Sequence, residues 1–288
     1  MKKSNQPLVS VVIPCYNHEK FVQDSIQSVI DQSYANIELI IIDDGSKDSS
    51  VEKIQQMIPA CENRFLRFEF RTRPNKGLSV TLNEALAWCE GEYYSAIASD
   101  DLMVDRKTEI QVNYLEENEN CAAVFGGYDL IDEENKILLS NIGTEKTYCF
   151  DEIFMHDHEL PAPTQMIVMN AIKAVRGYPE GVVIEDWYMW LKLSENSQLH
   201  YIPEKLSLYR SHSDNISKKI NIMHGGRVQI INNYPDHPLY SKAMLNVKWV
   251  WLSELRAAKS SKYFISFLIF FMFNPLYSME KFKKRYLM

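Results

Sequence analysis

The sequence has few of the features that would hold a chain together covalently or bind it to nucleic acid. Its 288 residues include five cysteines, an odd number with no C-x-x-C spacing. This argues against a disulfide framework or a structural zinc site and favours a reducing compartment. The net charge is −7. Because non-specific nucleic-acid binding depends on a basic surface, we expect no nucleic-acid partner.

Several motifs with a known mechanism are also missing. The sequence contains no Walker A loop and no G-x-G-x-x-G motif. The N-terminal stretch MKKSNQPLVSVVIP has no apolar segment ahead of the first predicted strand, so we expect no signal peptide. Hydrophobic residues make up 46% of the chain and charged residues 24%. This is an ordinary globular composition, and the length suits one large domain or two small ones.

The first 130 residues alternate between strand-like and helix-like segments. Strands are predicted over 8–13, 37–42, 65–70, 93–98 and 122–128, and helices over 19–33, 49–57, 78–90 and 105–117. A hairpin turn is predicted over 132–136, and helices are predicted from about residue 218 onward. This order predicts an α/β fold with a mostly parallel, twisted sheet and helices on both faces.

Three of the predicted strands end in polar clusters. These are Pro14-Cys15-Tyr16-Asn17, Asp43-Asp44-Gly45-Ser46 and Ser99-Asp100-Asp101. Ligands of parallel α/β sheets bind beyond the carboxyl ends of the strands. We therefore expect the three clusters to meet at one edge of the sheet.

The adjacent acids Asp100 and Asp101 follow a strongly apolar run. Two like charges about 4 Å apart repel each other by on the order of 4 kcal/mol at an effective dielectric of about 20. A hard divalent cation such as Mg²⁺ or Mn²⁺, which takes oxygen ligands, would offset that repulsion. A solvated loop would only dilute it, and local sequence leaves both interpretations open.

The other polar motifs also have two interpretations each. The segment Asp43–Ser46 is typical of a simple turn, but a carboxylate there could accept a hydrogen bond from a nucleotide base. The segment Asn75-Lys76-Gly77 could be an ordinary loop, or it could let a phosphate approach the helix that follows.

Acids and histidines in the second half are equally ambiguous. Glu185-Asp186 opens a predicted helix, where the helix dipole favours acids in any case, and could alternatively supply a general base. His212 is a lone histidine, and most such residues are structural. His156 and His158 flank Asp157 and imitate a metal-binding pair, although a solvated loop is the favoured interpretation.

Taken in order, the segments PCYN, ELIIIDDGS, NKGLSVTLNEAL, GEYYSAIASDD, IEDWYMWLKL and LYRSHSDNIS resemble glycosyltransferase family 2 with the GT-A fold. More narrowly, they resemble the bacterial members that build O-antigen and capsule polysaccharide. The resemblance covers about residues 8–217. It implies a Rossmann-like GT-A domain over 1–217, with a nucleotide-sugar part over about 1–103 and an acceptor part over about 104–217. A helical extension would follow over 218–288.

The resemblance implies inverting transfer of one sugar from a nucleotide sugar, with UDP-sugar the expected donor, to an acceptor hydroxyl. It assigns donor contacts to Pro14, Tyr16, Asn17, Asp43, Asp44, Lys76, Gly77, Asn83 and Asp100, with Asp44 on the uracil ring. It assigns Mn²⁺ or Mg²⁺ to Asp101 with help from His212, and the catalytic base to Asp186 with Glu185 beside it.

The sequence departs from the family pattern at two positions. Many relatives have Asp-x-Asp-Asp at the metal motif, where this chain begins with Ala98. Many also have arginine directly before the helix asparagine, where this chain has Leu82. The Q-x-x-R-W signature of processive synthases is absent, so we expect one sugar to be added per encounter.

Alternative functions remain at this stage. The first is a non-catalytic sugar-nucleotide-binding or assembly protein on a degenerate GT-A fold, against which the retention of Asp44, Asp101 and Asp186 argues. A nucleotidyltransferase ranks last, because the glycine-rich basic N-terminal loop of that class is missing. Guanine and thymine remain open as the nucleobase.

The C-terminal region contains the uncharged run YFISFLIFFMF over residues 263–273, followed by Asn274, Pro275 and a basic aromatic end. The run falls short of the roughly 20 apolar residues that span a bilayer. It could be a core helix, or it could dock on anionic lipid. The resemblance implies polyprenyl-diphosphate-linked saccharide acceptors, so we expect peripheral attachment to the cytoplasmic face of the inner membrane.

Overall fold

The computed structural model describes residues 6–213 and 215–286. The chain divides into two compact units, Met1–Asp214 and Asn215–Met288. We call them the first and the second unit. The domain boundary expected after residue 217 and the expected split into donor and acceptor parts stay predictions.

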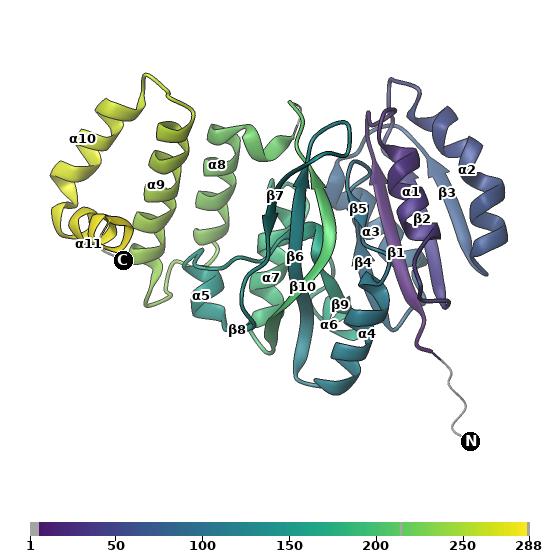
Figure 1. Ribbon diagram of the computed structural model, residues 1–288. Coiled ribbons are helices and arrows are strands. Elements are labelled where there is room, and N and C mark those ends of the chain that lie inside the picture. The colour runs from purple at the N-terminus through teal and green to yellow at the C-terminus, as the bar shows by residue number, and fades with distance from the viewer. Residues whose placement is uncertain (1–5, 214, 287–288) are drawn as a thin grey trace. The chain divides into compact units, whose positions relative to one another are not determined.

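The first half of the first unit alternates strands and helices (Figure 1). Its elements are β1 (Val9–Cys15), α1 (Val22–Ile30), β2 (Ile37–Asp43), α2 (Ser50–Arg64), β3 (Phe68–Thr72), α3 (Leu78–Trp88), β4 (Tyr93–Ala96), β5 (Leu102–Met103) and α4 (Lys107–Glu117). The predicted strands and helices are confirmed here, apart from shifts at their ends. Strand β2 is buried along its whole length, as its nearly continuous apolar run predicts.

The second half of the first unit is less regular. Its elements are β6 (Cys121–Ile131), β7 (Ile137–Asn141), β8 (Lys146–Tyr148), α5 (Phe150–Phe154), the short 3₁₀ helix η1 (Ala162–Thr164), β9 (Met166–Val168), α6 (Met169–Ala174), α7 (Glu185–Ser194) and β10 (Gln198–Arg210). The predicted hairpin turn is confirmed, because the Asp132 N–H donates to the Lys136 carbonyl and joins β6 to β7.

One sheet organises the first unit, with strand order β3-β2-β1-β4-β9-β6-β10-β5. Strand β7 pairs with β6, and β8 pairs with β10. The pairs β1–β2, β2–β3, β1–β4 and β6–β10 are parallel, whereas the short β9 is antiparallel to both of its neighbours. The predicted mostly parallel sheet is therefore confirmed.

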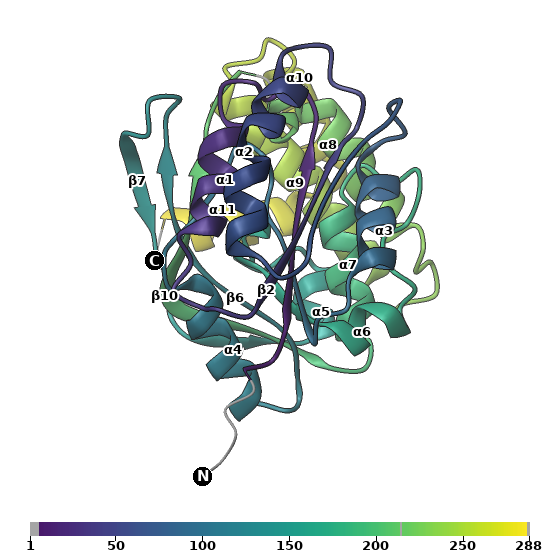
Figure 2. The same ribbon diagram turned by 90° about the vertical axis from the view of Figure 1, so that its right-hand side faces the viewer.

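Helices cover both faces of this sheet. Helices α1, α2 and α4 lie on one face, and α3, α6 and α7 lie on the other (Figure 2). The apolar positions of α1, which include Val22, Ile26 and Val29, join the core cluster with alternate residues of β1 and β2. This spacing of three and four residues is the one that predicts the helix from sequence.

Helix α2 is longer than predicted. It continues from Ser50 to Arg64 through Pro59, although proline in a helix interior removes one hydrogen bond. Tertiary contacts offset that cost. Ile54 and Cys61 are fully buried, and the Arg64 guanidinium donates to the carbonyls of Ile30, Gln32 and Tyr34 in the loop after α1.

The second unit is helical, as predicted. It contains the 3₁₀ helix η2 (Ile216–Lys218) and helices α8 (Ile220–Ile231), α9 (Tyr240–Ala257), α10 (Tyr263–Phe273) and α11 (Pro275–Tyr286). In α10 only Phe270 is buried. No single described helix could cross a membrane by length and composition. The pair Tyr263–Phe273 and Pro275–Lys283, bent by 112°, passes such a test only when taken together.

Candidate active site at the carboxyl edge of the sheet

The loops after β1, β2 and β4 meet at one edge of the sheet. Asn17, in the loop after β1, donates its N–H to Ser46 Oγ at 2.9 Å and accepts the Lys47 N–H at 2.7 Å. Asn17 adopts φ = 55°, a left-handed conformation that asparagine tolerates better than most residues. The next residue, His18, reaches the β4 end, with Nδ1 2.7 Å from Ser99 Oγ. The predicted meeting of the three strand ends is confirmed.

Asp43 shapes the turn after β2. Its Oδ1 accepts hydrogen bonds from the Gly45 and Ser46 N–H groups and from Thr72 Oγ1. Gly45 has φ = 77°, and an added Cβ would lie 2.6 Å from the Asn75 nitrogen. A glycine is therefore required here. The Asp43 carboxylate is buried inside the turn. This fits the interpretation of the segment as a simple turn.

Asp44, the neighbour of Asp43, is also buried, and its hydrogen bonds fix the loop that precedes α3. Its carboxylate accepts the N–H groups of Lys76 and Gly77 at 2.8 and 2.9 Å, and the Arg73 guanidinium also donates to it. Arg73 is held in turn by Glu84 and Thr81 on α3. The loop amides and Arg73 leave this carboxylate little capacity for a further donor.

Asp100 lies in a cluster with two histidines. His212 Nε2 is 2.8 Å from Asp100 Oδ2, and His18 Nδ1 is 3.8 Å from Asp100 Oδ1. One ligand atom of each of these three residues lies within 4.8 Å of the other two. Burial opposes ionisation of Asp100, but the His212 hydrogen bond and the fields of His18 and His212 outweigh it and lower the pKa of Asp100.

Asp101 has a different environment from its neighbour. Its Oδ1 accepts the backbone N–H of Arg210 at 2.8 Å at the end of β10. Burial, and then the charge of Asp100, raise the pKa of Asp101 well above its ordinary value. The buried Arg210 guanidinium also donates to the Asp100 carbonyl at 2.8 Å and so braces the whole turn. The sequence assigned the metal contact to Asp101, whereas the structure groups Asp100 with the histidines.

A second pair of acids opens helix α7. Glu185 and Asp186 are both half-buried. Burial and the neighbouring Asp186 raise the pKa of Glu185 to about 8, and burial also raises the pKa of Asp186. Asp186 Oδ1 accepts the Trp187 N–H at 2.6 Å. A carboxylate with a raised pKa near a surface is suited to take up a proton at neutral pH.

The remaining predicted donor contacts fall into two groups. Pro14 lies in β1, Tyr16 is exposed just beyond it, and Lys76 and Gly77 belong to the loop on Asp44. Asn83 lies elsewhere, because its amide exchanges two 2.8 Å hydrogen bonds with the Tyr178 backbone. The structure thus ties Asn83 to the segment ahead of α7 and not to the strand-end loops.

Sequence reasoning did not single out His18, Arg73 or Arg210. His18 directly follows the PCYN segment, and Arg210 lies inside the LYRSHSDNIS segment, two residues before His212. Arg73 lies two residues before Asn75 and supplies a guanidinium close to the helix that lacks arginine at position 82. These residues could have been found from the sequence by considering the charged and imidazole side chains in or immediately next to each motif.

The cluster of His18, Asp100 and His212 fits a divalent cation by its donor chemistry. It offers two imidazole nitrogens and one carboxylate oxygen, two of its members are buried, and all three come from loops at the sheet edge where ligands bind. Mg²⁺ prefers oxygen ligands in a near-ideal octahedron, whereas imidazole suits softer divalent metals. By its donor chemistry the set fits a divalent transition metal.

Solved structures share this architecture. Staphylococcus aureus TarS (residues 1–349) matches 87% of this chain and 72% of its own with a TM-score of 0.63 at 15% identity. The Pyrobaculum calidifontis mannosyltransferase PcManGT, solved with GDP-Man and Mn²⁺, matches 98% of this chain and 84% of its own with a TM-score of 0.63 at 12% identity. These similarities show the fold, which is of the GT-A class.

The family follows from the sequence comparisons. The profile of Glycosyl transferase family 2 matches residues 10–176, more than half of the chain, and the chain belongs to that family. A putative teichuronic acid biosynthesis glycosyltransferase of Bacillus subtilis, TuaG, is 30% identical over 74% of this chain and 82% of its own length. An uncharacterized glycosyltransferase of Rickettsia bellii is 29% identical over 91% of this chain, but the chain spans only 35% of that protein.

Proposed function

We propose that the protein is an inverting, metal-dependent glycosyltransferase that moves one sugar from a nucleotide sugar to an acceptor hydroxyl. The observation that carries the proposal is the meeting of the loops after β1, β4 and β10 at His18, Asp100 and His212, in a chain of family 2. This edge is where parallel α/β sheets bind nucleotides. Asp186 and Glu185 supply raised-pKa carboxylates in the same unit.

His18, Asp100 and His212 would hold the cation, and we propose Mn²⁺ as the preferred ion. When bound, it would neutralise the charge that grows on the departing nucleoside diphosphate. Arg210 keeps Asp100 and Asp101 in place through the Asp100 carbonyl and the Asp101 carboxylate. Asp101 remains our sequence-based candidate for a further contact to the ion.

Asp186 is the proposed base that takes the proton from the attacking hydroxyl, with Glu185 beside it. Burial raises the pKa of both acids above the usual range of carboxyl groups, and a general base is most effective when its pKa lies near the operating pH. Such a base contributes about 10²–10⁴-fold in rate. Attack on the face opposite the leaving group would invert the anomeric carbon.

UDP-sugar is the donor that we propose. Structures of TarS contain UDP and UDP-GlcNAc, which supports a uracil nucleotide only by analogy of fold. In this chain Asp44 holds Arg73 and the Lys76–Gly77 amides. We propose that base recognition comes from this assembled loop as much as from the Asp44 carboxylate alone.

The proposed acceptor is a polyprenyl-diphosphate-linked saccharide in the synthesis of a bacterial surface polysaccharide. The similarity to TuaG, whose name refers to teichuronic acid biosynthesis, supports this class of pathway. Because such acceptors lie in a membrane, we also propose peripheral attachment at the cytoplasmic face of the inner membrane.

The first experiment measures nucleoside diphosphate release from a panel of UDP-, GDP- and dTDP-sugars with Mn²⁺, Mg²⁺ or EDTA. We expect release from one donor that is faster with Mn²⁺ than with Mg²⁺ and abolished by EDTA. Asp186→Asn should lower the rate of transfer about 10²–10⁴-fold, while the exposed control Glu134→Gln should keep full activity. Donor binding with no release, even with a lipid-linked acceptor present, would favour the non-catalytic alternative.

Membrane attachment has support in the second unit. Helices α10 and α11 expose large apolar side chains that a soluble surface seldom gathers, namely Phe264, Ile265, Ile269, Met272, Phe273 and Leu276. The lysines at 262, 281 and 283 flank this surface in sequence. Interfacial helices combine such an apolar face with basic residues that meet anionic lipid.

Vesicle flotation tests this attachment. The full chain should float with vesicles that contain phosphatidylglycerol, and binding should weaken at high salt. The double substitution F273D/L276D should weaken binding about 100-fold or more, because each apolar side chain buried in lipid contributes about 1.5–3 kcal/mol. The control is Leu66→Asp, which changes an exposed leucine of the first unit. Equal flotation of the double variant would contradict membrane docking through α10 and α11.

A further inference from the structure

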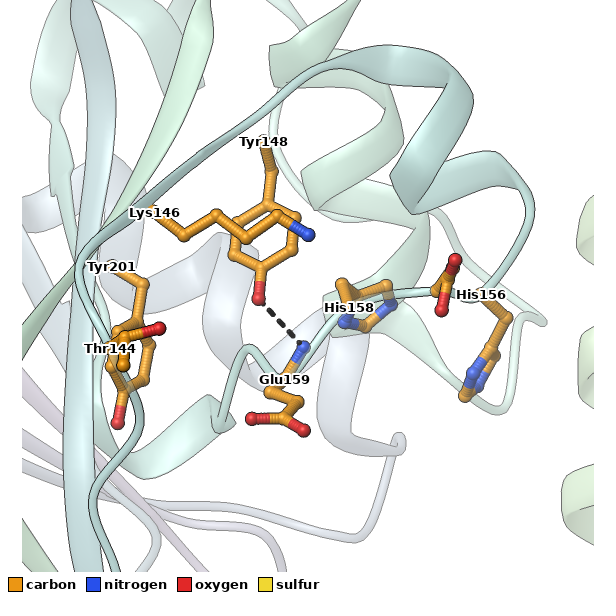
Figure 3. A pocket seen from close by; sticks show the side chains of 8 residues that line it. Thr144, Lys146, Tyr148, His156, His158, Glu159 and Tyr201 are labelled. Atoms are coloured by element: carbon orange, nitrogen blue, oxygen red, sulfur yellow. Dashed lines mark hydrogen bonds between the residues drawn. The ribbon is translucent and has the colours of Figure 1, made fainter. Parts of the chain in front are cut away.

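A cavity in the second half of the first unit shares no lining residue with the strand-end cluster. It has a volume of about 360 Å³ and is lined mainly by Lys146, Tyr148, His156, His158, Glu159 and Tyr201 (Figure 3). The lining comes from β8, the loop that follows α5, and the start of β10. This volume lies at the lower end of the range for small-molecule sites, so it suits one or two sugar rings better than a long chain.

The charges of the lining disfavour an anion. Lys146 is paired with Glu152 at 3.0 Å, outside the lining, and lies over the Tyr148 ring at 4.4 Å. The acids Asp157 and Glu159 both line the cavity and are both exposed. Burial lowers the pKa of His158 well below its ordinary value, so this imidazole is neutral. A diphosphate would meet two carboxylates here and only one cation, which already has a partner.

The polar groups of the lining instead match hydroxyls. His158 Nδ1 accepts the Leu160 N–H at 3.4 Å, which leaves the ring proton on Nε2. That buried Nε2 has no hydrogen-bond partner among the described residues. The hydroxyl oxygens of Tyr148 and Tyr201 accept the backbone N–H groups of Glu159 and Gly143. Each phenol therefore keeps its proton for donation, while the two carboxylates can accept from a ligand.

The cavity is connected to the helix that carries the proposed base. The His156 ring packs edge-on against Trp187 at 4.8 Å, and the His158 ring packs edge-on against Trp190 at 5.5 Å. Trp187 directly follows Asp186, and its Nε1 donates to the Ile153 carbonyl of α5. The two tryptophans thus join the cavity wall to the first turns of α7.

We propose that this cavity is a subsite for a neutral sugar residue of the acceptor, other than the residue that receives the donor sugar. The proposal rests on the proposed transferase function, and it names the part of the acceptor that this chain reads outside the reaction centre. Aromatic faces with a few fixed donors and acceptors are the usual lining of a small-molecule site. Occupation would orient the acceptor against the helix of Asp186.

The test is a fluorescence titration of the full chain, in which Trp187 and Trp190 report on the cavity. The probes are the methyl glycosides of glucose, galactose, mannose and N-acetylglucosamine, with inorganic pyrophosphate as the anionic probe and UDP present throughout to occupy the donor site. We expect one glycoside to bind with a Kd of about 1–10 mM and pyrophosphate not to displace it. Donor hydrolysis, measured in parallel without acceptor, reports the proposed function separately.

Glu159→Gln and Asp157→Asn, which change the two exposed acids of the lining, should each weaken glycoside binding about tenfold, the usual effect of losing one strong hydrogen bond. Both variants should keep the wild-type rate of donor hydrolysis. The matched control is Glu134→Gln, an exposed acid in the β6–β7 hairpin outside the cavity. No response to any of the four glycosides, an equal response in the variants, or displacement by pyrophosphate would overturn the subsite while leaving the transferase function standing. Glycoside binding by a chain that releases no nucleoside diphosphate from any donor, even with a lipid-linked acceptor present, would overturn the function instead.

Discussion

In the sheet of the first unit, acids are buried at both the amino and the carboxyl ends of the strands. Different partners balance their negative charges at the two ends. At the amino end, Glu38 on β2 accepts the Arg67 guanidinium and Ser10 Oγ at 2.6 Å each and the Gly91 N–H at 3.1 Å. At the carboxyl end, Asp100 faces the imidazoles of His18 and His212, and Asp101 accepts the Arg210 N–H.

The difference lies in what the partners can release. The guanidinium and amide donors around Glu38 keep their protons at any physiological pH, so this end is a permanent structural joint. The imidazoles around Asp100 can instead offer a ring nitrogen to a metal ion. Burial of an acid therefore does not mark a site by itself. The ability of its partners to change state distinguishes the carboxyl end from the amino end.

The largest effect should come from breaking the joint at the amino end. Glu38→Ala removes the buried carboxylate that accepts from Ser10 Oγ and the Glu90 N–H, and should lower the free energy of unfolding by about 2–4 kcal/mol. The partly exposed Arg67 keeps its ion pair with Glu90. Denaturant unfolding measures the loss of stability, and turnover per folded molecule should not change. Glu69→Ala is the control, since its ion pair with Arg71 is partly exposed and should contribute less than about 1 kcal/mol.

At the carboxyl end, Asp100→Asn should act on turnover and not on stability. We expect donor turnover to fall about 100-fold or more, because the cation would lose its only carboxylate in the histidine cluster. The free energy of unfolding should change less than in Glu38→Ala, since the amide keeps an oxygen beside His212 Nε2 and the charge at position 100 no longer repels Asp101. If Asp100→Asn instead unfolded the protein severely while its folded fraction kept normal turnover, the proposed difference between the two ends would be wrong.

Lys107 is a third buried ionisable group, and it differs from both acids because it has no oppositely charged partner among the described residues. Lys107 donates to Ser95 Oγ and the Gln165 carbonyl, and burial lowers its pKa to about 7. Lys107→Met should raise the free energy of unfolding at pH 7 by about 1–2 kcal/mol. Ser95 also donates to the Gln165 carbonyl, so that bond survives the substitution.

The pH dependence of this variant has a definite sign. The unfolded chain binds the Lys107 proton up to about pH 10.5 and the folded chain only up to about pH 7. Wild-type stability should therefore rise between these values, by up to about 1.4 kcal/mol per pH unit. Unfolding curves at pH 7 and pH 9 should show the advantage of the variant shrinking. A constant difference would mean that Lys107 is not neutral in the folded protein.

Much of the fold could be predicted because local patterns agree with the tertiary structure. The apolar run of β2 and the spacing of Val22, Ile26 and Val29 predict their elements directly. The short β9 escaped prediction, since three residues carry no period and this strand exists through its pairing with β4 and β6. Continuation of α2 past Pro59 likewise depends on burial of Cys61.

The sequence by itself determined that polar clusters end three parallel strands, and the order of its motifs identifies the family. Both follow from information local in the chain: the period of a strand, the residues that follow it, and their sequence order. Only the tertiary structure decided which acid faces the histidines, since His18, Asp100 and His212 are far apart in sequence. The same holds for Arg73 on Asp44 and for the cavity against α7. Side-chain contacts between distant segments depend on packing, and no local pattern encodes packing.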